Sequence, residues 1–76
     1  MSDHDRIRWQ CRRGMLELDL VLNRFLESSL EHLDAVQLQL FKELLNEADT
    51  HLLAWVMGQE TAPARYAALV RQLQQQ

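Results

Sequence analysis

The chain has 76 residues, of which 47% are apolar and 25% are charged. This length supports one small core and no cleft between two domains, so we predict a single domain over residues 1–76. The longest apolar run, from Leu52 to Met57, has six residues, whereas a bilayer span needs about 20; direct membrane insertion is therefore excluded. The net charge of −3 disfavours nucleic acid as the main partner.

The charges are unevenly distributed. Residues 1–14 carry a net charge of +2, whereas residues 15–60 hold nine acids against two bases, a net charge of −7. The last sixteen residues add two arginines. This pattern is typical either of an ordinary solvated surface or of a docking face centred on arginine, and the composition does not decide between the two.

Cysteine and histidine usage argues against a metal or redox site. Cys11 is the only cysteine, so the chain forms no internal disulfide and no cysteine-rich zinc site. The three histidines are scattered, at positions 4, 32 and 51, and we expect no metal. The first eight residues lack the apolar segment of a secretory signal, which with the lone cysteine predicts a cytoplasmic protein.

Good helix formers dominate the chain, which has only two glycines and one proline, and this predicts an all-α fold, a small compact bundle of five short helices. The first helix is expected over residues 5–13, and Gly14 ends it by adopting a left-handed conformation. The second begins near Met15 and closes between residues 28 and 33. Its apolar stripe has helical spacing: Leu18, Val21, Leu22, Phe25 and Leu26.

The third helix is predicted to open with a capping box formed by Asp34 and Gln37. A fourth helix is expected to start with Asp49 as its N-cap and to end before Gly58. One continuous helix over residues 35–57 stays open, because the apolar spacing runs unbroken across Asp49: Leu38, Phe41, Leu45, Ala48, Leu52 and Trp55. We prefer the break, because the residues around position 49 favour helix caps.

The last helix is predicted to use Pro63 in its first turn and to turn four side chains inward: Tyr66, Leu69, Val70 and Leu73. The glutamine-rich tail is expected to fray from about residue 72. Trp9 and Trp55 are both predicted to lie in the core, with a place in an interface as the lesser alternative for Trp9. The hydroxyl of Tyr66 is expected to face water.

No catalytic constellation is present in the sequence. The adjacent serines lie in a helical stretch without a glycine elbow, and the two glycines are solitary, so no phosphate-binding loop is formed. Cys11 beside Arg12 is a candidate for a lowered pKa, but a small buried apolar role explains it better. We therefore assign no catalytic residue and favour a binding module over an enzyme.

One segment carries a pattern of functional interest, Arg13-Gly14-x-x-Glu17 at a junction between two helices. Arg13 offers a fork of donors to a partner carboxylate or carbonyl, Gly14 permits close approach of another backbone, and Glu17 lies near the positive end of the second helix. The structural alternative is a simple helix stop at Gly14 with a weak local Arg13–Glu17 ion pair. Candidate contacts at the rim are Arg8, Trp9, Arg12 and Asp19.

The stretch from Arg12 to Asp19, Arg-Arg-Gly-Met-x-Glu-Leu-Asp, resembles the SdhE family (also called YgfY or CptB) of succinate dehydrogenase assembly factors. The resemblance covers nearly the whole chain, through Trp9 and Cys11 before the motif and these residues after it: Phe25, Phe41, Leu44, Leu45, Asp49, Leu52, Trp55 and Met57. It implies a five-helix protein whose functional motif falls on Arg13, Gly14 and Glu17, all retained here.

The resemblance also implies a partner, the flavoprotein subunit of succinate dehydrogenase and in bacteria that of fumarate reductase. Members promote covalent attachment of FAD to a histidine of that subunit, so FAD is expected to be the partner's cofactor and not to be bound by this chain, which we expect to be a monomer. An antitoxin-like or regulatory module with a different protein partner is the alternative, and a small nucleic-acid binder is disfavoured by the acidic body.

Overall fold

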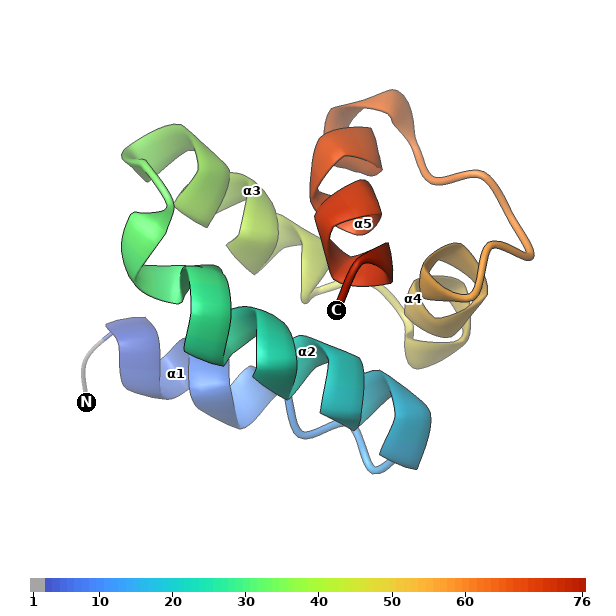
Figure 1. Ribbon diagram of the computed structural model, residues 1–76, viewed down its shortest axis with the longest axis horizontal. Helices are drawn as coiled ribbons and strands as arrows, with labels where there is room; N and C mark the ends of the chain where they lie inside the picture. The colour runs from blue at the N-terminus through green and yellow to red at the C-terminus, as the bar shows by residue number, and fades with distance from the viewer. Residues whose placement is uncertain (1–2) are drawn as a thin grey trace.

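The computed structural model describes residues 3–76, and their side chains from residue 4 onward; residues 1 and 2 of the predicted domain lie outside the described part. Five α-helices follow one another in chain order (Figure 1), and residues 3–76 contain no strand. The helices are α1 (Asp3–Gln10), α2 (Leu16–Ser29), α3 (Ala35–Leu44), α4 (Asp49–Val56) and α5 (Ala67–Gln74). Short 3-10 turns, η1 (Leu30–His32) and η2 (Ala64–Tyr66), precede α3 and α5. The predicted all-α class is confirmed.

The central element is α2, which contacts both α4 and α5 and buries four residues of its apolar stripe. Phe25 of this stripe meets Phe41 of α3 with ring centroids 5.0 Å apart and planes tilted by 49°, a favourable aromatic arrangement. The radius of gyration of 11.3 Å matches the value of about 11 Å expected of one compact domain of this length. The fully buried side chains at the centre include Leu18, Leu22, Phe25, Phe41, Leu44, Leu52 and Tyr66.

The first helix ends earlier than the sequence predicted. Its last α-helical residue is Gln10, and the chain then closes a tight turn in which the Arg12 amide donates to the carbonyl of Trp9 over 3.1 Å. Gly14 has φ +81°, the left-handed conformation expected of it, but it turns the chain toward α2 instead of directly ending α1. The early stop frees Arg13 for the contacts described below.

The break between the third and fourth helices is confirmed, because α3 ends at Leu44 and α4 begins at Asp49. The predicted capping box is also present: the Gln37 amide donates to the Asp34 carboxylate over 2.8 Å, and the Asp34 amide donates to the Gln37 side chain over 3.2 Å. The predicted cap of α4 is wrong. Ala48, whose backbone is extended, occupies the N-cap position without a side-chain bond, and Asp49 is already the first helical residue; its carboxylate binds Arg13.

The C-terminal tail stays helical through Gln74, two residues beyond the point where fraying was predicted to begin. Burial of Leu73 holds this end against the core. The Gln74 side chain donates to the carbonyl of Trp55 over 2.9 Å, and the Ser28 hydroxyl donates to the Gln76 side chain over 3.2 Å. These contacts tie the end of α5 to α4 and α2.

The aromatic side chains depart from the prediction at two positions. Trp55 is buried as expected, but Trp9 is 69% exposed. The reason is helical phase: Ile7 and Cys11, four residues apart, turn the same face of α1 inward, and Trp9 lies about 200° from Ile7 around the axis. Tyr66 is 1% exposed, and its hydroxyl accepts a hydrogen bond from the Arg65 guanidinium instead of facing water.

Candidate functional site: the turn between α1 and α2

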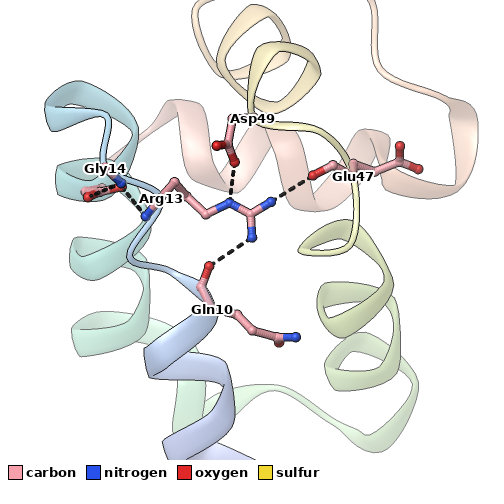
Figure 2. A network of polar contacts seen from close by, with 6 residues as sticks. Gln10, Arg13, Gly14, Glu47 and Asp49 are labelled. Carbon is pink, nitrogen blue, oxygen red and sulfur yellow. Dashed lines mark hydrogen bonds and ion pairs between the residues drawn. The ribbon is translucent and has the colours of Figure 1, made fainter.

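The motif residues lie where the chain turns from α1 into α2, and residues 11–15 of this turn are called the α1–α2 corner. Arg13 is the centre of a polar network there (Figure 2). Its Nε donates to the Asp49 carboxylate over 2.6 Å, its Nη1 to the carbonyl of Gln10 over 3.0 Å and its Nη2 to the carbonyl of Glu47 over 2.7 Å. One guanidinium therefore links the end of α1, the α3–α4 turn and the start of α4.

These contacts change the role expected of Arg13. The side chain is only 14% exposed, and each of its three nitrogens has an acceptor within the chain. The expected contact of Arg13 with a partner carboxylate thus competes with an internal ion pair. The local ion pair with Glu17 that the sequence left open is replaced by the pair with Asp49, 36 residues away.

Asp19 fixes the backbone of the same corner from the α2 side. Its carboxylate accepts from the Arg13 amide over 2.8 Å and from the Gly14 amide over 3.1 Å. These two amides lie just before Met15, the N-cap residue of α2, so Asp19 fixes the backbone that leads into α2 and does not cap the helix itself. Both oxygens of the Asp19 carboxylate therefore already accept hydrogen bonds within the chain. The predicted contact of Asp19 with a partner would have to form beside these bonds.

Gly14 is exposed and open on its outer side. A Cβ built at this position would meet no atom within 4 Å, so the requirement for glycine inside the free chain comes from its positive φ alone. Left-handed backbone costs a residue with a Cβ roughly 1–2 kcal/mol. The open space above Gly14 also leaves its backbone accessible to another molecule.

Beside Gly14, α2 presents both charge and apolar surface to solvent. Glu17 is exposed, and Leu16 is 83% exposed, although it is a large apolar side chain. Met15, Leu16 and Glu17 line a shallow hollow of about 250 Å³ together with Leu53 of α4. An exposed apolar patch with a carboxylate at its edge is typical of protein-binding surfaces.

The remaining predicted rim residues lie on the α1 side of the corner. Arg8, Trp9 and Arg12 are all exposed, and the Arg12 guanidinium lies 5.9 Å from the centroid of the Trp9 ring, a cation–π pair. The structure therefore separates the predicted residues into two kinds. Those with free surfaces are Arg8, Trp9, Arg12, Gly14 and Glu17, and those engaged inside the chain are Arg13 and Asp19.

The sequence did not predict the three acceptors of the Arg13 guanidinium, which are the Asp49 carboxylate and the carbonyls of Gln10 and Glu47. Asp49 had been interpreted as a helix cap, a role that its residue type and position also suit. Backbone carbonyls leave no signal in a sequence. An Arg–Asp pair 36 positions apart becomes visible only when the α3–α4 turn is folded against α1.

The described residues include one buried free thiol, that of Cys11. Burial raises the pKa of the Cys11 thiol from 9.0 to about 12, against the smaller lowering effect of Arg13, so the lowered pKa considered for Cys11 is wrong. No cluster of histidine, cysteine or acidic residues in the described part of the chain suits a metal ion. None of the helices formed by residues 3–76 is long and apolar enough to span a membrane.

The fold and the corner together define a small all-helical protein that presents a braced, exposed turn. Residues 5–76 match the model of the family described as flavinator of succinate dehydrogenase, and the chain belongs to this family. The resemblance drawn from the motif is confirmed.

Curated proteins similar to this chain are named FAD assembly factors. The chain is 48% identical over 58 residues to the FAD assembly factor SdhE of Legionella pneumophila (strain Lens), covering 76% of this chain and 73% of that protein. It is 39% identical over 71 residues to the FAD assembly factor SdhE of Coxiella burnetii (strain RSA 493 / Nine Mile phase I), covering 92% and 87%. These relatives are named as assembly factors and not as catalysts. No solved structure gives a significant match.

Proposed function

We propose that this chain binds the flavoprotein subunit of succinate dehydrogenase and promotes covalent attachment of FAD to it, with the flavoprotein of fumarate reductase as a second client. Family membership and the names of the relatives support an assembly role for succinate dehydrogenase. In this proposal the chain acts as a cytoplasmic monomer, and FAD belongs to the partner. This chain contributes binding energy and no catalytic group.

The observation that carries the proposal is the exposed surface beside a firmly held turn. Glu17 and Leu16 face solvent next to Gly14, whose backbone is open, while Arg13 and Asp19 hold that backbone from beneath. A preorganised surface of this kind loses little conformational entropy on binding. Less of the binding free energy is then consumed in ordering this chain, and more of it is available to change the conformation of the partner.

The proposed mechanism is control of the partner's geometry. The α1–α2 corner docks where two domains of the flavoprotein meet and favours the arrangement in which the flavin lies against its acceptor histidine. Holding two reacting groups together lowers the entropic part of the barrier, and a binding partner shifts a conformational equilibrium by its differential affinity for the two states. Glu17 accepts from a donor of the flavoprotein, Leu16 buries apolar surface, and Gly14 admits the partner's backbone.

The test is covalent flavin fluorescence. The flavoprotein is expressed with and without this chain in a host lacking its own copy, and in-gel fluorescence is read after denaturing electrophoresis. We predict a bright band with the native chain and a loss of at least about tenfold with Glu17→Ala, since one hydrogen bond to a charged group is worth roughly 1.5–3 kcal/mol. Gly14→Arg is also expected to dim the band, because its side chain fills the space that the partner's backbone would occupy. Glu17→Ala is expected to keep its helical circular dichroism, because the position is exposed. Gly14→Arg is expected to lose roughly 1–2 kcal/mol of stability through the positive φ of this position and to keep its helices.

The matched control is Glu27→Ala, which removes another exposed carboxylate of α2 two helical turns or more from the corner. It is expected to leave the fluorescence unchanged. Equal bands with and without the native chain would contradict the assembly role and direct attention to another protein partner. Loss of helicity in Glu17→Ala would instead make the motif structural.

A further inference from the structure

Two carboxylates from different helices hold the α1–α2 corner. Asp19 of α2 binds the backbone amides of Arg13 and Gly14, and Asp49 of α4 binds the Arg13 side chain (Figure 2). Asp19 is close in sequence to the groups it holds, whereas Asp49 is 36 residues away from Arg13. The position of the corner relative to α4 therefore depends on a contact that the local sequence around the motif does not contain.

The Arg13–Asp49 contact has the features of a strong structural interaction. The Nε–Oδ1 distance is 2.6 Å, and the two side chains are 14% and 41% exposed, so water only partly screens the pair. The Arg13 guanidinium also donates to the carbonyls of Gln10 and Glu47, which fixes its plane. Charge-assisted bonds of this geometry are about twice as strong as neutral ones.

The surface that faces solvent is assembled from the segments that this contact joins. Met15, Leu16 and Glu17 follow Gly14 on α2, and Leu53, which completes the hollow, lies four residues after Asp49 on α4. The Arg13–Asp49 pair is therefore one of the contacts that join the two sides of the hollow. Asp49 itself is not among the residues that line the hollow.

We propose that Asp49 is a positioning residue of the docking corner: it keeps Arg13 inside the chain and so holds the Gly14 turn and the α4 side of the hollow in the arrangement that the flavoprotein binds. This inference rests on the proposed function. It assigns Arg13 a role in bracing the corner and leaves contact with the partner to Glu17, Leu16 and the backbone of Gly14.

The opposing possibility is that Arg13 leaves Asp49 during docking and pairs with a carboxylate of the partner. The two possibilities predict different effects of Asp49→Ala on the affinity for the flavoprotein. If Asp49 braces the corner, Asp49→Ala weakens docking. If Asp49 competes for Arg13, its removal frees the guanidinium and leaves docking unchanged or strengthens it.

The experiment measures the dissociation constant of the full chain for the purified apo-flavoprotein of succinate dehydrogenase by calorimetry, together with the yield of covalent flavin. We expect Asp49→Ala to weaken binding about tenfold, and the double variant Arg13→Ala/Asp49→Ala to be no worse than Arg13→Ala alone, since the two residues act as one unit. Asp49→Asn, which keeps an acceptor without the charge, is expected to fall between the native chain and Asp49→Ala, and it carries the test if Asp49→Ala does not fold.

Asp34→Ala is the control for stability. It removes the cap of α3 and lowers stability by an amount comparable to the loss of one polar contact, but it leaves the corner intact, so binding is expected to match the native chain. A second readout is amide hydrogen exchange in the free protein: the Arg13 and Gly14 amides are expected to exchange faster in Asp49→Ala and not in Asp34→Ala.

The outcomes separate the two proposals. If the native chain neither binds nor flavinylates the flavoprotein, the proposed function fails. If the native chain is active and Asp49→Ala binds as well as or better than it, the positioning role of Asp49 is overturned while the function stands. Equal weakening by Asp34→Ala and Asp49→Ala would also overturn it, because the effect would then follow stability alone.

Discussion

At the scale of single residues, Cys11 and Trp9 show how the direction of a side chain at the end of α1 sets its exposure and reactivity. They are two positions apart, yet Cys11 is fully buried, whereas Trp9 is 69% exposed. Burial raises the pKa of the Cys11 thiol to about 12, so it remains protonated and unreactive near neutral pH, because the thiolate is the nucleophile. The same phase of α1 leaves Trp9 available for contact with Arg12.

We predict that Cys11 makes stability fall with rising pH between about pH 9 and 12. The thiol ionises at about pH 9 in the unfolded chain and only near 12 in the folded one, so across this window the folded state binds more protons and rising pH favours unfolding, by at most about 1.4 kcal/mol per pH unit. Urea unfolding at several pH values measures this slope. Cys11→Ala provides the comparison, and an identical slope in that variant would contradict the prediction.

At the scale of elements, the helix starts are held by different means. α3 begins with a side-chain capping box, whereas α2 begins at Leu16 with no cap from its N-cap residue Met15 and relies on Asp19 to satisfy the amides just before it. The start of α4 also lacks a side-chain cap, and its first residue is bound to Arg13. The two helices that line the hollow thus lack a side-chain cap from their N-cap residues; a local contact through Asp19 holds the approach to α2, and a long-range contact through Asp49 holds the start of α4.

We predict that Asp34→Ala lowers the free energy of unfolding by about 1 kcal/mol, because it removes the side-chain half of the capping box. Asp34→Ser, which keeps a good N-cap acceptor, is expected to recover most of the loss. Urea unfolding followed by circular dichroism measures both. Equal stability of Asp34→Ala and the native chain would show that the box, although formed, does not stabilise α3.

At the scale of the whole molecule, stability depends on one core built around α2. Phe25 and Phe41, both fully buried, contact each other with tilted rings at its centre and join α2 to α3. A domain of this length has a total stability of roughly 4–11 kcal/mol, so the loss of one large side chain removes a large share of it. The exposed corner is therefore supported by a core whose free energy of unfolding is small.

We predict that Phe25→Ala costs about 3–5 kcal/mol and broadens or abolishes the cooperative thermal transition. The matched control is Leu20→Ala on the same helix; Leu20 is 47% exposed, and the expected change is within about 0.5 kcal/mol. Differential scanning calorimetry distinguishes the two. A sharp transition in Phe25→Ala with a small drop in midpoint would contradict the single-core description.

The amino-acid sequence by itself determined the helical class, the capping box at Asp34, the break between α3 and α4, and the position of the motif at a turn between helices. These features depend on interactions between residues a few positions apart, such as apolar spacing, caps and the left-handed preference of Gly14, and such interactions are readable along the chain. The family was likewise recognisable from the residues around the motif.

The roles of the individual polar side chains were decided only by the tertiary structure. Arg13 was expected to bind a partner, which stays a prediction, and Asp49 to cap α4; in the folded chain the two side chains bind each other across 36 positions. A charged group binds whichever acceptor lies within reach once the core has packed, and two backbone carbonyls complete this site without any sequence signal. The exposure of Trp9 was decided in the same way, by the face that α1 turns toward the core.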